Sequence, residues 1–113
     1  MDYKGKAQTS YTIVAPASLE AEGDHVFKVH AEWMKKTHYR EGDKALLQYT
    51  VAKSSDSDGN VLFVLTEVYE TVAGIEDHRE QAHGADWYSE FTKWASQCQV
   101  IGGGDDVVIQ SLW

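Results

Sequence analysis

Two alternating segments joined by a short polar run constrain the fold of this chain more than any other feature. In residues 44–54, KALLQYTVAKS, and again in residues 61–70, VLFVLTEVYE, successive side chains alternate with the period of two that is typical of a β-strand. The run SSDSDGN between them ends in Asp58-Gly59-Asn60, residue types that supply a positive φ where two antiparallel strands reverse. The chain is therefore expected to contain an antiparallel hairpin.

The remaining elements are predicted from helical periodicity, capping residues and breakers. A strand over 11–15 is ended by Pro16, and Asp24 is expected to cap a helix that follows it. Thr71 is expected to cap a second helix that Gly84 ends, and Asp86 a third one, DWYSEFTKWASQ. A last strand is expected in VVIQSLW, residues 107–113, and residues 1–10 are expected to be a flexible segment before a single domain of residues 11–113.

This order of elements predicts an α+β fold. It is the split βαβ pattern of a ferredoxin-like domain, a four-stranded antiparallel sheet with its helices on one face. In residues 61–70 apolar side chains occur on both faces, with Leu62, Val64 and Val68 opposite Phe63 and Leu65. The sheet face without helices thus also needs cover, and we expect a homodimer in which two such faces pack together.

Charge and composition exclude several classes of function. The 113 residues suit one domain. Ten Lys and Arg against eighteen Asp and Glu give a net charge of -8, which disfavours nucleic acid and anionic membrane surfaces as partners. No apolar run approaches a membrane span, and the N-terminus lacks the apolar core of a signal peptide. A lone Cys98 fits a reducing compartment, so a cytoplasmic protein is expected.

Metal and cofactor motifs are not predicted. His25 with His30, and His78 with His83, are five residues apart, which differs from the i,i+4 spacing of a helical zinc pair, although distant histidines can still converge in a fold. The glycines of residues 102–104 do not open a helix after a strand, so they form no nucleotide-binding turn. We expect no metal and no cofactor.

His78 is the first candidate for chemistry. It shares a helix stripe with Ile75 and Ala82 and should point towards the sheet, where an imidazole could accept a proton from a phenol or quinol. The alternative is a buried histidine whose hydrogen bonds are satisfied by a carbonyl group, Glu67 or Tyr69.

Aromatic side chains on other elements are candidates for ligand contact. His30 and Trp33 are one helical turn apart, and the indole could stack on a flat ligand or simply pack in the core. Tyr49 and Tyr69 could each donate a hydrogen bond to a ligand oxygen or reach solvent at the rim of the sheet.

The segment LTEVYETVAGIEDHREQAH, followed by WYSEF, resembles the antibiotic biosynthesis monooxygenase family of dimeric α/β barrels. That family has a strand ending in a Tyr-Glu-like pair, an acidic and alanine-rich helix with an inward His, and a second His before an aromatic run. The residues in those roles here are Glu67, Tyr69, His78, His83 and Phe91. Heme-degrading relatives carry a Trp where His78 stands, which weakens a heme-based function.

The resemblance implies a cofactor-independent monooxygenase that oxidises an electron-rich aromatic phenol or quinol between the helices and the sheet. His78 would be the base, and Trp33 and Tyr49 would assist it. The expected substrate contacts are His30, Tyr69, His83, Trp87 and Phe91. The alternative is a non-catalytic dimeric module of the same fold that binds a small molecule or serves in a stress response.

Overall fold

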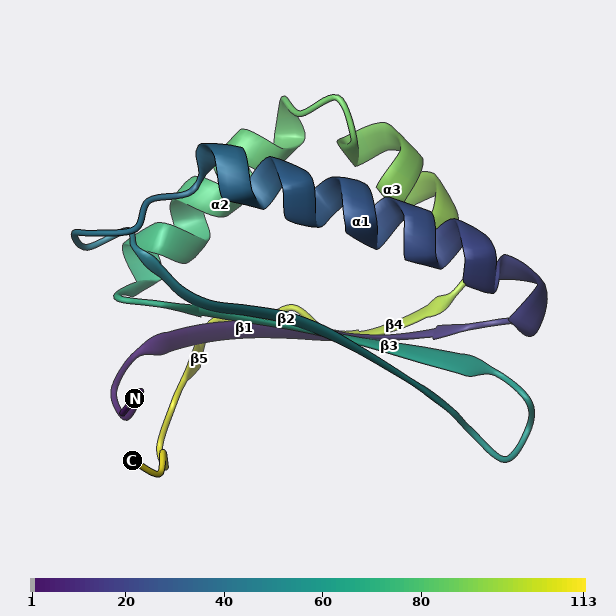
Figure 1. The fold of residues 1–113 in the computed structure, drawn as a ribbon, viewed down its shortest axis with the longest axis horizontal. Coiled ribbons are helices and arrows are strands. Elements are labelled where there is room, and N and C mark those ends of the chain that lie inside the picture. The colour runs from purple at the N-terminus through teal and green to yellow at the C-terminus, as the bar shows by residue number, and fades with distance from the viewer. Residues whose placement is uncertain (1) are drawn as a thin grey trace.

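The computed structural model describes residues 2–113, which form an α+β domain with a five-stranded antiparallel sheet and three helices (Figure 1). The helices lie together over one face of the sheet. In chain order the elements are β1 (Ala7–Ala15), a 3-10 turn (Ala17–Leu19), α1 (Glu20–Thr37), β2 (Leu46–Ser55), β3 (Val61–Tyr69), α2 (Val72–His83), α3 (Tyr88–Ala95), β4 (Gln99–Gly102) and β5 (Asp106–Val107).

The sheet is built around β1 and β3, in the order β2-β3-β1-β4, with β5 also paired to β1. The predicted β2–β3 hairpin is confirmed. In its turn an Asp56 carboxylate oxygen accepts the backbone N–H groups of Asp58 and Asn60, both at 2.9 Å. Gly59 has a φ of +82°, which a residue with a side chain rarely adopts. The strands therefore reverse where the polar run indicated.

The predicted starts of the first strand and of two helices are wrong. Residues 1–10 are not wholly a flexible segment, because β1 begins at Ala7, whose side chain is buried. α1 begins at Glu20, so Asp24 lies inside the helix and does not cap it. Likewise α3 has Trp87 at its N-cap and no side-chain cap, in place of the predicted Asp86.

The backbone of α1 approaches the core closely at Gly23, inside the helix. A Cβ added to Gly23 would lie 2.6 Å from ring atoms of both Phe63 and Trp94. At this glycine the helix backbone meets two buried rings, which leave no room for a side chain.

The C-terminal strand predicted over residues 107–113 is also wrong. The chain pairs with β1 through β4 and then through the two-residue β5, giving five strands instead of four. At the end of β4, Gly102 has a φ of +100°, and an added Cβ would lie 2.4 Å from the Ser10 carbonyl oxygen. The side chains after β5 that the pattern assigned to a strand are largely exposed, including Ile109 and Leu112 at 74% each.

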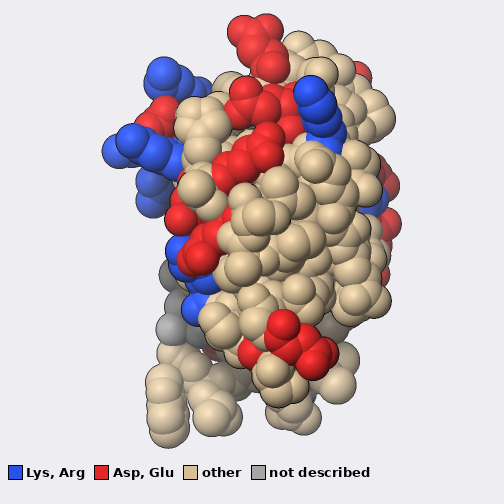
Figure 2. All heavy atoms as spheres, turned by 90° about the vertical axis from the view of Figure 1, so that its right-hand side faces the viewer, with Lys and Arg blue, Asp and Glu red and all other residues tan. Residues whose placement is uncertain are grey.

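The main core lies between the sheet and the N-terminal half of α1, closed at one end by α3. Its buried members are Ile13, Ala15, Val26, Phe27, Val61, Phe63, Leu65 and Trp94. Acidic side chains border a broad uncharged area at the end of the molecule shown in Figure 2, in keeping with the net charge of -8. Among the helices of residues 2–113, none has the length and apolar character needed to cross a membrane.

Candidate functional site

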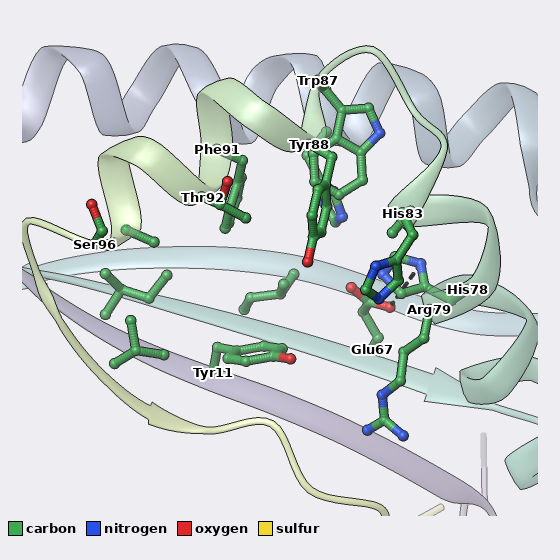
Figure 3. Close-up of a pocket in the computed structure, with 16 residues that line it drawn as sticks. Tyr11, Glu67, His78, Arg79, His83, Trp87, Tyr88, Phe91, Thr92 and Ser96 are labelled. Carbon is green, nitrogen blue, oxygen red and sulfur yellow. Dashed lines mark ion pairs between the residues drawn. The ribbon is translucent and has the colours of Figure 1, made fainter.

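A cavity of about 460 Å³ lies between the sheet and the pair α2 and α3 (Figure 3). The sheet forms its floor, on which the Tyr11 ring lies, and Tyr88 and Phe91 point down into it from α3. The residues that line it are Tyr11, Ile13, His30, Leu65, Glu67, His78, Arg79, Ala82, His83, Trp87, Tyr88, Phe91, Thr92, Ala95, Ser96 and Val100.

Glu67 is the one acidic side chain of the lining, and the alternation of β3 places it there. Phe63, Leu65 and Glu67 are two residues apart, so all three face the helices. The Glu67 side chain is 1% exposed, and its Oε1 accepts a hydrogen bond from the Tyr69 hydroxyl at 2.5 Å. Burial disfavours the charged form and raises the pKa of Glu67 to about 7, against the opposing effects of the Tyr69 hydrogen bond and Arg79.

His78 reaches the same point from α2. The helix starts where predicted, because the Thr71 hydroxyl oxygen accepts the Ala73 N–H at 3.1 Å, and it ends at Gly84. His78 Nδ1 lies 2.9 Å from His38 Nε2 and 3.8 Å from Glu67 Oε1. Burial is the main cause that lowers the pKa of His78 to about 4, and the nearby His38 and Arg79 act in the same direction.

His30 completes this group from α1. Its Nδ1 shares a hydrogen bond of 2.8 Å with the Tyr49 hydroxyl, and the side chain is 2% exposed. Burial, followed by the proximity of His78 and His38, lowers the pKa of His30 to about 3. The imidazole is therefore neutral near pH 7, and it is surrounded by rings, the nearest being Trp87 with its centroid at 4.7 Å.

These side chains give the cavity a definite chemical character. A carboxyl group with a pKa of about 7 and two neutral imidazoles sit at one end of the cavity. The rest of the lining is mainly aromatic and aliphatic, with Arg79, His83, Thr92 and Ser96 as its other polar residues. The carboxyl group and the imidazoles can take a proton from a weakly acidic ligand, and the rings suit a flat apolar body. Single ligand atoms of His30, Glu67 and His78 lie within 4.8 Å of one another, so these three residues could also hold a metal ion.

Five of the predicted site residues line the cavity and three do not. The five are His30, His78, His83, Trp87 and Phe91. Trp33 lies behind this wall, with ring centroids 5.6 Å from His78 and 5.0 Å from Trp87. Tyr49 lines a separate hollow of about 210 Å³ and reaches the site only through His30. Tyr69 is fully buried and reaches it through Glu67.

Several lining residues were given no catalytic or binding role from the sequence, although Glu67 was part of the family resemblance and carried a usable signal. Glu67 shares the inward face of a strand with Phe63 and Leu65, and a carboxylate in such a position is buried whenever the strand is covered. Tyr11 and Val100 are brought together by the β1–β4 pairing, which the sequence pattern did not reveal. Arg79 points away from the cavity centre and forms an ion pair with Asp105 at 2.7 Å.

Fold and site together define the chain as an α+β domain with an aromatic cavity and a buried Glu–His group. No family model matches the chain, and no curated protein matches it. Among solved structures, it is similar to the crystal structure of PA3566 from Pseudomonas aeruginosa, with a TM-score of 0.59 and 16% sequence identity. The match covers 99% of this chain and 100% of that one. At this level of identity the likeness shows a shared fold alone.

Proposed function

We propose that this protein is a cofactor-independent monooxygenase that oxidises an electron-rich aromatic phenol or quinol in the cavity between α2, α3 and the sheet. The observation that carries the proposal is the placement of Glu67 and His78, 3.8 Å apart, at the wall of a space otherwise formed mainly by rings and aliphatic groups. A cavity of about 460 Å³ is within the range of small-molecule sites.

The proposed reaction uses the substrate as its own reductant. The proton of the bound phenol or quinol passes to the Glu67–His78 pair, and the resulting anion donates an electron to dioxygen. One oxygen atom enters the product as a carbonyl group, and the other leaves as water with two hydrogen atoms of the substrate. The protein then has to supply a base, a fixed orientation and an environment with little water, all of which a ring-lined cavity favours.

The other predicted residues orient the proton acceptors or contact the substrate in this proposal. Tyr49 orients His30 through their shared hydrogen bond, and Tyr69 orients Glu67 in the same way. Trp33 packs behind His78 and limits its movement. Trp87 and Phe91 contact the aromatic body of the substrate from above, and His83 lies at the rim.

We also propose that the chain forms a homodimer of the dimeric α/β barrel kind through the sheet face that the helices leave bare. The strand order β2-β3-β1-β4 with the helices on one face agrees with the ferredoxin-like pattern of such barrels. By the register of the sheet, that face carries no Asp, Glu, Lys or Arg in the central strands β1 and β3. Its residues there are Gln8, Ser10, Thr12, Val14, Leu62, Val64 and Thr66, together with Val68, which is already buried within the chain. Uncharged, half-apolar surfaces of this kind are typical of interface centres.

The test is oxygen uptake with a panel of hydroxynaphthalenes and anthrones, in the presence of a metal chelator. We expect uptake above background for the wild type and a loss of about 10²-fold or more when both proton acceptors are removed in Glu67→Gln/His78→Ala. His25→Ala is the matched control, because His25 is an exposed α1 residue that contacts Glu90. Absence of uptake by the wild type would refute the reaction, and binding without uptake would favour a non-catalytic module. Unchanged uptake by the double variant would refute the role of the base.

A further inference from the structure

Three metal-ligating side chains converge from three separate elements at one end of the cavity. His30 comes from α1, Glu67 from β3 and His78 from α2, and one ligand atom of each lies within 4.8 Å of the others. Zinc bonds of about 2.0–2.2 Å place neighbouring ligand atoms about 3–4 Å apart. An inward shift of the order of an ångström would therefore close the group around an ion.

The surroundings hold each imidazole by a hydrogen bond to Nδ1, so an ion would be bound through Nε2. The His78 nitrogen that lies 3.8 Å from Glu67 Oε1 is Nδ1, so this ring has to turn to present its Nε2 to the ion. Nδ1 of His30 is engaged by the Tyr49 hydroxyl, and Nδ1 of His78 by His38 Nε2. In metal sites a ligating histidine almost always makes such a hydrogen bond through its second nitrogen, which fixes the orientation of the ring. Glu67 is held in a comparable way by the Tyr69 hydroxyl on Oε1.

Burial adds a second argument. Glu67 is 1% exposed, and His78 at 3.8 Å is its nearest possible cation. A buried carboxylate without a cation is costly, and a divalent ion coordinated by it offsets that cost. Two imidazole nitrogens with one carboxylate oxygen suit zinc or ferrous iron, whereas calcium and magnesium prefer oxygen ligands alone.

We propose that His30, Glu67 and His78 form a binding site for one divalent transition-metal ion, whose remaining coordination positions face the cavity. A bound ion would occupy the lone pairs with which Glu67 and His78 accept a proton. It would therefore inhibit the metal-free oxidation. This inhibition rests on the proposed function, but the binding of the ion does not.

The test is calorimetric titration of the untagged protein with ZnCl2, together with visible absorption after addition of CoCl2. Both are done in a Cys98→Ser background, which removes the one thiol of the chain as a competing ligand. We expect one ion per chain and an affinity at least about tenfold weaker in His30→Ala, His78→Ala and Glu67→Gln. The matched control is His83→Ala, because His83 lines the same cavity without belonging to the group. Circular dichroism identifies any variant that fails to fold.

Two results would overturn the proposal. One is the absence of binding at millimolar ZnCl2, and the other is equal affinity in the wild type and in the folded His30→Ala and His78→Ala variants. Oxygen uptake separates this proposal from the proposed function. If zinc binds but no oxygen is taken up in the presence of chelator, the proposed reaction is refuted and the metal site is not. If saturating zinc leaves oxygen uptake unchanged, inhibition at this site is refuted.

Discussion

Gly74 of α2 offers a sharp test of how closely this helix packs on the sheet. A Cβ added there would lie 2.4 Å from Tyr69 Cδ1 and 3.0 Å from the Lys44 carbonyl oxygen. Tyr69 is fully buried and its hydroxyl is bound to Glu67, so the ring cannot swing aside without breaking that hydrogen bond. In Gly74→Ala the helix itself has to move away from the sheet.

The expected cost follows from two opposing effects. Overpacking a close contact costs about 1–3 kcal/mol, whereas replacing glycine by alanine inside a helix gains up to about 1 kcal/mol. The net free energy of unfolding should fall by about 1–2 kcal/mol. For a domain of this size that corresponds to a fall in Tm of roughly 3–10 °C.

Urea denaturation and thermal melting measure this loss. Gly84→Ala is the matched control, because Gly84 ends the same helix with a φ of -102° and an added Cβ would meet its nearest atom at 3.9 Å. The control should stay within about 0.5 kcal/mol of the wild type. If Gly74→Ala were as stable as Gly84→Ala, the packing of α2 on Tyr69 described above would be wrong.

Three further predictions concern the cap of α2, the bare sheet face and the pH dependence of stability. Thr71→Ala should lower the free energy of unfolding by about 1 kcal/mol, because the Thr71 hydroxyl accepts the Ala73 N–H and donates to the Asp43 carbonyl oxygen. Thr71→Ser keeps both hydrogen bonds and should stay close to the wild type in the same urea titration. Equal stability of all three proteins would show that the cap does not stabilise the helix. Val64→Lys places a charge in the centre of the sheet face that the helices leave bare, and it should shift the mass measured by light scattering from dimer to monomer. A wild type that is already monomeric would contradict the proposed homodimer. Burial raises the pKa of Glu67 from 4.5 to about 7, so in chelator its contribution to stability should fall as the pH rises from 4.5 to 7 and then level off. His30 and His78 have lowered pKa values, so their contribution to stability falls as the pH drops below 6.5. The test is therefore the difference in free energy of unfolding between the wild type and Glu67→Gln, which should shrink or reverse in favour of the variant as the pH rises from 4.5 to 7. A difference that does not change with pH would contradict the raised pKa of Glu67.

Local patterns in the sequence were sufficient where a single element or turn decides the structure. The β2–β3 hairpin and the two ends of α2 follow from residue types that act within a few positions of the chain, such as Gly59 and Thr71. The same alternation that predicted β3 also places Glu67 on its inward face.

The errors arose where tertiary contacts override local preference. Glycine commonly interrupts helices, but Gly23 lies inside α1, where two rings of the core leave no room for a side chain. The short β4 became visible only through its pairing with β1, and the apolar residues after β5 were mistaken for a strand. No spacing rule could bring His30 and His78 together, because they come from different helices and meet over the sheet.

Binding of a hydroxynaphthalene, followed by quenching of tryptophan fluorescence, tests the assignment of the cavity as the ligand site most directly. Trp87 lines the cavity and should be quenched as the ligand fills it. Ala95→Phe projects a ring into the space from α3 and should weaken binding at least about tenfold, whereas Ala21→Phe, on the exposed side of α1, should bind as the wild type does. Equal affinity in Ala95→Phe and Ala21→Phe would show that the ligand binds elsewhere and would contradict this account of the site.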